Sequence, residues 1–387
     1  MRKTYIISYK TRVDIFVNIF FWIFVFAIFI QLFYALFFFV RLSFYKSKKG
    51  IFNEGVSVII CAKDESENLS KNLPSFLEQD YSTFEVIVVN DQSVDGTKYL
   101  LQDLEKKHEN LKVVTIDNHI NSRVGKKFAL AIGIKTAQYD YVLLSDADCT
   151  TVSKNWIRKM SASFSEKDIV LGISPYRKKK GLLNKFIRFD EFIVMLQYLS
   201  FALAKTPYMG VGRNLGYKKS LFFSVKGFAS HIHIPSGDDD LFIQEVATRD
   251  NVAIQIDNDA DITSIPKDTY SDWSYQRKRH ISTSKYYKKS RKILLFLFPF
   301  SQVLFWFPAI ILFVFHSFLF SFPNGLILIS SLFLGRILLY YFVYFHAMKK
   351  LRHFDLFFFF PLIEFAYLFV QLFFVLLKSR YRQKSWK

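Results

Sequence analysis

Two carboxylates separated by one alanine end an apolar run in the middle of the chain. Residues 141–144 are apolar, and Asp146 and Asp148 follow them after one serine. A short apolar run bounded by polar residues is typical of a buried strand, and ligands of open α/β sheets bind beyond the carboxyl ends of such strands. Carboxylate oxygens suit Mg²⁺ or Mn²⁺, which proteins often hold together with substrate phosphates. The pattern therefore indicates a divalent-metal site, with a solvated turn after a strand as the alternative.

Two more acidic turns follow apolar runs. Residues 56–62 end at a turn that contains Glu65, residues 84–89 end at a turn that contains Asp91, and residues 111–116 form a third predicted strand. Strands that alternate with helices are typical of a mostly parallel sheet with helices on its faces. Helix capping alone would account for either turn. The sequence thus predicts an α/β fold with acidic turns at one edge of the sheet.

A glycine and two lysines open the predicted helix before the Asp146 strand. Lys126 and Lys127 follow Gly125. Lysines at a helix start oppose the helix dipole, and an anionic phosphate bound there would compensate for them. The earlier glycine of a Walker A loop is missing at the required spacing. The lysines therefore indicate a phosphate-bearing ligand in a different kind of site.

Apolar residues gather near both ends of the chain. Of 387 residues 46 are phenylalanine, and the apolar stretches cover residues 15–40 and 293–377. Because about 20 apolar residues span a bilayer, we expect one N-terminal membrane helix and about three C-terminal ones. Interruptions at Pro299 and Pro308, and at Pro361 and Glu364, mark segments that are candidates for interfacial or re-entrant structure. The predicted organisation is an N-terminal tail and membrane helix (1–50), an α/β domain (51–290), and C-terminal membrane helices with a basic tail (291–387).

The net charge of +19 would suit a nucleic-acid partner, but the basic residues cluster beside the apolar segments. Examples are residues 285–292 and 378–387. Basic residues at such places meet anionic headgroups, so the membrane surface is the expected partner and nucleic acid is not. The first apolar segment is too long for a signal peptide, and no small-residue cleavage site follows it. Basic residues follow it instead, which favours a cytoplasmic α/β domain.

The order of the motifs resembles that of family 2 glycosyltransferases. The matching segments are residues 58–65, 90–97, 125–126, 145–148, 210–217, 226–228, 236–241 and 276–280. The similarity is to the membrane-bound branch with cellulose, chitin and hyaluronan synthases and lipid glycosyltransferases. It implies a GT-A fold, which is Rossmann-like with a mostly parallel sheet, flanked by transmembrane helices.

The resemblance also implies a donor site. Glu65, Asp91 and Lys126 would contact the nucleotide, with Asp91 on the uracil side. Asp148 would coordinate Mg²⁺ or Mn²⁺ directly, while Asp146 would reach the ribose or the metal. A divalent cation stabilises the charge that develops on a leaving diphosphate.

Three consecutive aspartates contain the residue that matches the family's general base. This residue is Asp239, with Asp238 beside it and Asp240 after it. Inverting sugar transfer needs one base for the acceptor hydroxyl, unlike the paired carboxylates of hydrolases. Neighbouring carboxylates raise one another's pKa. A solvated acidic loop is the alternative reading of the three residues.

The segment 276–280 matches the family's Gln-X-X-Arg-Trp pattern except at its last residue, which is His280. By this resemblance Gln276 lies at the diphosphate and acceptor region, and Arg279 and Arg277 would neutralise the diphosphate. The missing Trp lines the acceptor end in the family, so His280 puts the acceptor and processivity in question. A basic membrane-surface helix is the alternative.

Two further features are assigned less directly. Arg213 and Asn214 follow a glycine-containing turn and are expected to line the acceptor pocket, with plain loop structure as the alternative. Residues 182–203 form either an amphipathic helix on the membrane or a core helix.

The expected protein is an inverting, membrane-bound glycosyltransferase. It would move a sugar from a nucleotide-sugar, expected to be UDP-linked, to a lipid or cell-envelope glycan at the cytoplasmic face of a bacterial inner membrane. The alternatives are a processive polysaccharide synthase with coupled export, a nucleotidyltransferase and an inactive membrane scaffold. The donor sugar does not follow from these motifs, because hydroxyl discrimination depends on the geometry of the pocket.

Overall fold

The computed structural model of the chain describes residues 2–47, 50–117, 125–316 and 324–376. Residue contacts divide them into two units. One is an α/β unit made of Tyr45–Lys288 and the tripeptide Lys350–Arg352, and the other is a helical unit made of the remaining described residues. The basic tail expected at residues 378–387 lies outside the described part of the chain.

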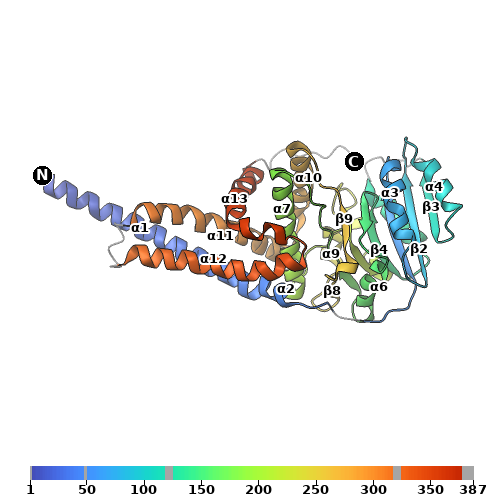
Figure 1. Ribbon diagram of the computed structural model, residues 1–387, viewed down its shortest axis with the longest axis horizontal. Coiled ribbons are helices and arrows are strands. Elements are labelled where there is room, and N and C mark those ends of the chain that lie inside the picture. Colours follow the sequence, from blue (N-terminus) through green and yellow to red (C-terminus); the bar gives the residue numbers. More distant parts are fainter. Residues whose placement is uncertain (1, 48–49, 118–124, 317–323, 377–387) are drawn as a thin grey trace. The chain divides into compact units, whose positions relative to one another are not determined.

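A seven-stranded sheet forms the centre of the α/β unit (Figure 1), with the strand order β3-β2-β1-β4-β7-β6-β8. Strands β1 to β4 are mutually parallel where they pair, and β7 runs antiparallel to both β4 and β6. The bounds are β1 (Val56–Ala62), β2 (Phe84–Asp91), β3 (Leu111–Ile116), β4 (Tyr141–Asp146), β6 (Ile169–Leu171), β7 (Leu215–Lys218) and β8 (Val252–Ile254). The predicted mostly parallel α/β fold is confirmed.

Helices cover both faces of the parallel half of the sheet, which explains why β1 is buried along its whole length. Leu73 and Phe76 of one covering helix belong to the same apolar core as Val58. On the other face Gly133 approaches Ile59 so closely that a Cβ would lie 2.6 Å from its Cγ2. The covering helices are α3 (Ser66–Leu77), α4 (Thr97–Glu105), α5 (Lys126–Thr136) and α6 (Trp156–Ser161). Because β1, β2 and β4 are parallel, their acidic turns lie at one edge of the sheet.

A second, two-stranded sheet begins directly after the turn at Asp146–Asp148. Strand β5 (Cys149–Thr151) pairs antiparallel with β9 (Ile262–Ser264). The helices of this half are α7 (Leu182–Leu203), α8 (Lys219–Ser224), α9 (Asp240–Val246) and α10 (Tyr270–Thr283). Single 3₁₀ turns occur at η2 (Ala162–Ser165), η3 (Ala229–His231), η4 (Asn258–Ala260) and η5 (Ser284–Tyr286). Most residues of α7 are buried, including the charged residues Arg188, Asp190 and Glu191, which favours the core-helix alternative.

The helical unit contains four helices that are long and apolar enough to cross a membrane. They comprise α1 (Arg2–Phe33) with the π-helical turn η1 (Tyr34–Phe39) and α2 (Val40–Phe44), then α11 (Lys289–Val314), α12 (Gly325–Lys350), and η7 (Phe354–Phe359) with α13 (Phe360–Leu376). Helix α11 continues through Pro299 and Pro308. Neither proline ends the helix.

A buried ion pair explains the acidic residue in the last apolar helix. Arg336 donates to both carboxylate oxygens of Glu364, at 2.7 and 2.9 Å, and its Nε donates to Gln31 at 2.5 Å. Both charged side chains are almost completely buried. Pro361 lies in the first turn of α13, where its missing N–H costs nothing. The charge of Glu364 is neutralised within the helical unit by Arg336, so α13 continues through this residue as well.

Candidate active site

Hydrogen bonds join the turns after β1 and β2. Asp64 accepts a hydrogen bond from the Val94 backbone N–H at 2.7 Å, and the Glu65 backbone N–H donates to the Thr97 hydroxyl at 3.0 Å. Glu65 precedes α3 in the N-cap position and accepts from Asn68 at 2.5 Å. These bonds fix the Glu65 turn against the turn that follows Asp91.

Asp91 is the last residue of β2 and is only 1% exposed. The next residue, Gln92, has a positive φ of 53° and donates its backbone N–H to the Ile116 carbonyl at 3.0 Å. The chain therefore leaves the sheet sharply just after the Asp91 carboxylate. The structure places Glu65 and Asp91 at the same sheet edge as Asp146, as the expected nucleotide site requires.

Lys126 connects two parts of the site that are far apart in the sequence. Its Nζ lies 2.5 Å from Asp146 Oδ1 and 3.5 Å from Asp238 Oδ2. The preceding Gly125 has φ 58° and ψ −154°, a conformation that favours glycine at the start of α5. Burial opposes the charge of Lys126, but the two carboxylates raise its pKa well above the ordinary value. Lys126 thus remains charged and connects two turns. They are the turn at residues 146–148, called the metal turn below, and the turn at residues 238–240, called the aspartate turn.

Lys127 has a different role from the phosphate contact that its place at the helix start suggested. Its side chain is fully buried, and its Nζ contacts His231 Nδ1 at 2.7 Å, the His231 carbonyl at 2.7 Å and the Ile234 carbonyl at 3.0 Å. Burial lowers the pKa of Lys127 to about 8. The residue anchors the segment that leads into Asp238, and sequence reasoning did not predict this contact.

The turn after β4 brings together the carboxylates proposed for the metal. Ligating atoms of Asp146, Asp148 and Cys149 lie within 4.8 Å of one another. Asp148 is exposed, whereas Cys149 is buried and donates to Asp148 Oδ1 at 3.3 Å. Burial raises the pKa of the Cys149 thiol well above its ordinary value, which disfavours the thiolate form that binds metals. The remaining donors are oxygens, which fit Mg²⁺ or Mn²⁺.

Asp239 is held by two backbone donors. The Gly212 N–H donates to its Oδ2 at 2.9 Å, and the Asp240 N–H donates to its Oδ1 at 2.7 Å. Burial raises the pKa of Asp239 to about 7, and the charges of Asp238 and Asp240 add to this effect. The preceding Gly237 has a φ of 95°, which a residue with a side chain rarely adopts. The turn therefore presents an oriented carboxylate with the basicity that proton abstraction near neutral pH needs.

Asp240 connects the aspartate turn to residues at and after the end of α10. The Thr283 and Tyr287 hydroxyls both donate to its Oδ2 at 2.5 Å. Burial raises its pKa, although both hydrogen bonds oppose the shift. The aspartate turn is thereby tied to the end of α10, which carries the Gln276–His280 segment.

Two arginines of the site are each paired with a carboxylate of α7. Arg213 lies 3.3 Å from Glu191, and Arg277 lies 2.9 Å from Asp190. Arg213 also packs over the Tyr176 ring, 4.5 Å from its centroid. Asp190 and Glu191 are nine-tenths buried or more, so each carboxylate holds its arginine in one orientation. The sequence contained a signal for both, namely charged residues inside an otherwise apolar helix.

The other predicted residues of this region separate into two groups. Gln276, Arg279 and His280 all lie on α10, where Gln276 donates to the Tyr176 hydroxyl at 3.2 Å and His280 is exposed. Asn214 is fully buried and bonds to the Ile173 and Ala260 carbonyls and to the Trp156 indole N–H. Asn214 therefore stabilises the core, and the expectation that it lines the acceptor pocket is wrong.

The charges of these elements act on the metal turn. Burial opposes ionisation of Asp146, but Lys126 lowers its pKa, and Arg213 and Arg279 lower it further. The arginines of two different segments are thus close enough to influence the same carboxylate. Cationic side chains therefore lie near the Asp146 carboxylate at the end of β4.

Comparison with known proteins identifies the kind of domain. Residues 57–223 match the family described as glycosyl transferase family 2. Over 135 residues the chain is 33% identical to poly-beta-1,6-N-acetyl-D-glucosamine synthase of Staphylococcus epidermidis, covering 34% of this chain and 31% of that protein. Over 137 residues it is 31% identical to 4,4'-diaponeurosporenoate glycosyltransferase of Staphylococcus haemolyticus, covering 35% of this chain and 36% of that protein. The chain thus spans about a third of the length of these curated relatives.

A solved structure has the same fold. The mannosyltransferase PcManGT of Pyrobaculum calidifontis, determined in complex with GDP-Man and Mn²⁺, superposes with a TM-score of 0.55 at 16% identity. The superposition covers 87% of this chain and 98% of that one. Together with the domain match, it confirms the predicted family resemblance and the GT-A type of fold.

Proposed function

Because residues 57–223 form a family 2 glycosyltransferase domain, we propose that the protein is a metal-dependent, inverting glycosyltransferase that takes a sugar from a nucleotide-sugar, preferably UDP-linked. The acceptor is a lipid or a cell-envelope glycan. The four apolar helices support a membrane location, for which the bacterial inner membrane with a cytoplasmic α/β unit is the proposed arrangement.

One observation carries the proposal. Lys126 contacts both Asp146, at the metal turn, and Asp238, at the turn of the proposed base. The donor sugar and the base must both lie close to the anomeric carbon at which transfer occurs. A residue that joins the two turns would hold them at that distance.

The proposed reaction uses the residues of both turns. The acceptor oxygen attacks the anomeric carbon as its proton passes to Asp239, and the bond from that carbon to the diphosphate breaks. The nucleoside diphosphate leaves, and the configuration at the carbon inverts. Arg277 and Arg279 bind the diphosphate as its charge develops, while Glu65 and Asp91 bind the nucleotide. Arg213, which the sequence placed in the acceptor pocket, is proposed to bind the diphosphate too, because it is close enough to Asp146 to lower the pKa of that carboxyl.

A divalent cation fits the oxygen donors of Asp146 and Asp148. When bound there with the substrate, it neutralises the diphosphate. The related fold solved with GDP-Man and Mn²⁺ supports the same class of ion for this chain. Asp148 is the proposed direct ligand, since Asp146 is already paired with Lys126.

The test is nucleoside-diphosphate release by the detergent-purified protein. Nucleotide-sugars are supplied one at a time, with Mn²⁺, with Mg²⁺ or with chelator, and with membrane lipid extract as acceptor. We expect metal-dependent release from one donor, increased by lipid. Release of pyrophosphate instead would support a nucleotidyltransferase, and no release from any donor would contradict the proposal.

A processive polysaccharide synthase is the second candidate. It is favoured by the similarity of residues in the matched region to a poly-beta-1,6-N-acetyl-D-glucosamine synthase. His280, in place of the family's Trp, speaks against it. Product length on a gel separates the two, because a single added sugar excludes processivity and a ladder supports it.

A further inference from the structure

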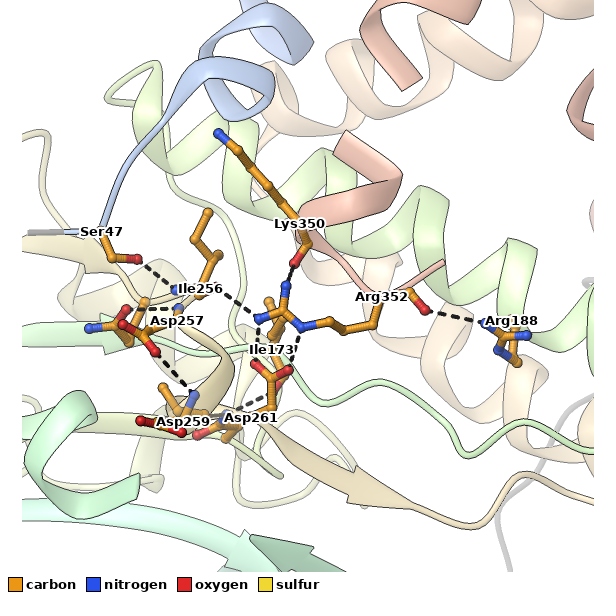
Figure 2. Close-up of polar contacts among 12 residues, drawn as sticks. Ser47, Ile173, Arg188, Ile256, Asp257, Asp259, Asp261, Lys350 and Arg352 are labelled. Carbon is orange, nitrogen blue, oxygen red and sulfur yellow. Dashed lines mark hydrogen bonds and ion pairs between the residues drawn. The ribbon is translucent and has the colours of Figure 1, made fainter. Parts of the chain in front are cut away.

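The last residue of the third candidate membrane span and the two residues after it belong to the α/β unit. They are Lys350–Arg352. Leu351 is fully buried, and Arg352 has a positive φ of 65°. This conformation is uncommon for a residue with a side chain, and it persists where the surroundings determine it. The Arg352 carbonyl accepts a hydrogen bond from Arg188 of α7 at 3.3 Å, as Figure 2 shows.

The Arg352 guanidinium contacts both oxygens of the buried Asp261 carboxylate. Its Nε donates to Asp261 Oδ2 at 2.7 Å, and its Nη2 lies 3.4 Å from Asp261 Oδ1 (Figure 2). The same Nη2 donates to the Ile256 carbonyl at 3.1 Å, and Nη1 donates to the Lys350 carbonyl. Asp261 is 4% exposed, and burial raises its pKa to about 7 while Arg352 opposes the shift. A planar guanidinium that bonds both oxygens fixes the carboxylate in distance and in angle.

Asp261 directly precedes β9, and β9 supports the metal turn. In the β5–β9 pair, Thr151 lies opposite Ile262 and Cys149 lies opposite Ser264. The Asp261 carbonyl also accepts from the Val152 N–H at 3.1 Å. Strand β5 begins at the residue after Asp148. The register of β9 therefore determines where the Asp148 carboxylate stands.

The other end of β9 supports an arginine of the site. Ser264 accepts a hydrogen bond from Arg213 Nη1 at 2.5 Å. Its carbonyl accepts from the Arg177 N–H at 3.0 Å. A strand of three residues thus has the Asp261 carboxylate at one end and a contact to Arg213 at the other.

We propose that Arg352 is a positioning residue of the active site. By fixing Asp261 it holds β9 in register, and β9 in turn positions Asp148 for the metal and Arg213 for the diphosphate. The inference rests on the proposed function for the roles of Asp148 and Arg213. Because Arg352 acts through Asp261 and β9, its effect appears in how tightly the metal and nucleotide bind.

The experiment measures Mn²⁺ binding in the presence of UDP, by electron paramagnetic resonance of the free ion, on the full-length detergent-purified protein. The variants are Arg352→Gln, Arg352→Lys and Asp261→Asn. Arg158→Gln is the matched control, because Arg158 forms an exposed ion pair with Asp80 at 2.9 Å and has no contact with β9 among the described interactions.

We expect Arg352→Gln and Asp261→Asn each to weaken Mn²⁺ binding by about threefold to tenfold, below the range for residues that touch a metal ligand directly. The Mn²⁺ affinity of Arg352→Lys should lie between those of Arg352→Gln and the wild type, because lysine retains the positive charge but cannot contact both carboxylate oxygens with a planar guanidinium. The double variant Arg352→Gln with Asp261→Asn should bind no more weakly than either single variant, since both remove the same contact. Arg158→Gln should stay within about twofold of the wild type, as expected for an exposed pair.

Wild-type Mn²⁺ affinity in Arg352→Gln would overturn the proposal, as would equal weakening in Arg158→Gln. If Arg352→Gln fails to fold, Arg352→Lys and Asp261→Asn decide by the same measurement. A wild-type protein that binds Mn²⁺ with UDP but releases no nucleoside diphosphate contradicts the proposed function, and the Arg352 comparison still holds. Absence of Mn²⁺ binding in the wild type overturns both.

Discussion

Transfer activity should rise with pH and level off above about pH 7, because Asp239 must be deprotonated to take the acceptor proton. Burial raises its pKa to about 7, and the neighbouring charges of Asp238 and Asp240 add to the shift. The deprotonated fraction falls about tenfold for each pH unit below the pKa. Activity at pH 6 should therefore be about a tenth of the plateau.

The same shift predicts an opposite trend in stability. The folded-state pKa of Asp239 lies above its ordinary value of 3.8, so the folded protein binds this proton more tightly than the unfolded chain does. The contribution to stability is complete below about pH 3.9, and it is lost as the pH rises through about 7. The base is thus most active at a pH where its charge destabilises the fold.

The assay is the initial rate of nucleoside-diphosphate release between pH 5.5 and 8.5, with donor and metal saturating at each pH. Asp240→Asn provides the comparison, because it removes one of the charges that raise the pKa of Asp239 and can still accept a hydrogen bond from Thr283. Its profile should shift to lower pH. A wild-type profile that stays flat from pH 5.5 to 8, or an Asp240→Asn profile that shifts upward, would refute the reasoning.

Three further perturbations test other contacts of the site. Glu191→Gln keeps a neutral acceptor but removes the ion pair with Arg213. Catalytic efficiency should therefore fall by about tenfold to a hundredfold, which corresponds to about 1.5–3 kcal/mol for a charged hydrogen bond. Unchanged efficiency would show that Arg213 needs no partner. Lys127→Met should lower the rate of transfer more than it lowers donor affinity, since the His231 segment leads to the base and not to the nucleotide, and steady-state kinetics check the ratio. Removal of divalent metal with chelator should abolish release in the wild type and Mn²⁺ should restore it, whereas Asp148→Ala should stay inactive at the same Mn²⁺ concentration.

Much of the fold follows from local patterns in the sequence. The strands at Val56–Ala62 and Leu111–Ile116 have the predicted bounds, and the strand at Phe84–Asp91 ends two residues beyond the predicted end at residue 89, because these apolar runs end at turn residues. The four apolar helices follow from length and composition alone. These features depend on residues close together in the chain.

The contacts within the site depend on residues far apart in the chain. Nothing near Lys127 indicates that it bonds to His231, which lies 104 residues away. Arg352 and Asp261 are 91 residues apart, and Arg352 lies outside residues 51–290, the range predicted for the α/β domain. Asn214 looked like a pocket residue because it follows a glycine-rich turn, yet its amide completes hydrogen bonds in the core. Such pairings are fixed by tertiary packing, which local patterns do not encode.

Asp239→Asn tests the central claim most directly, with UDP binding and sugar transfer measured on the same preparation. In either orientation of the amide of this variant, one of the two backbone N–H groups that contact Asp239 keeps an oxygen acceptor and the other faces the NH2 group, so UDP binding on the same preparation also reports whether the site remains folded. The account predicts UDP and Mn²⁺ affinities within about twofold of wild type, with transfer reduced by about 10²–10⁴-fold as expected for loss of a general base. Full transfer activity in this variant would contradict the account.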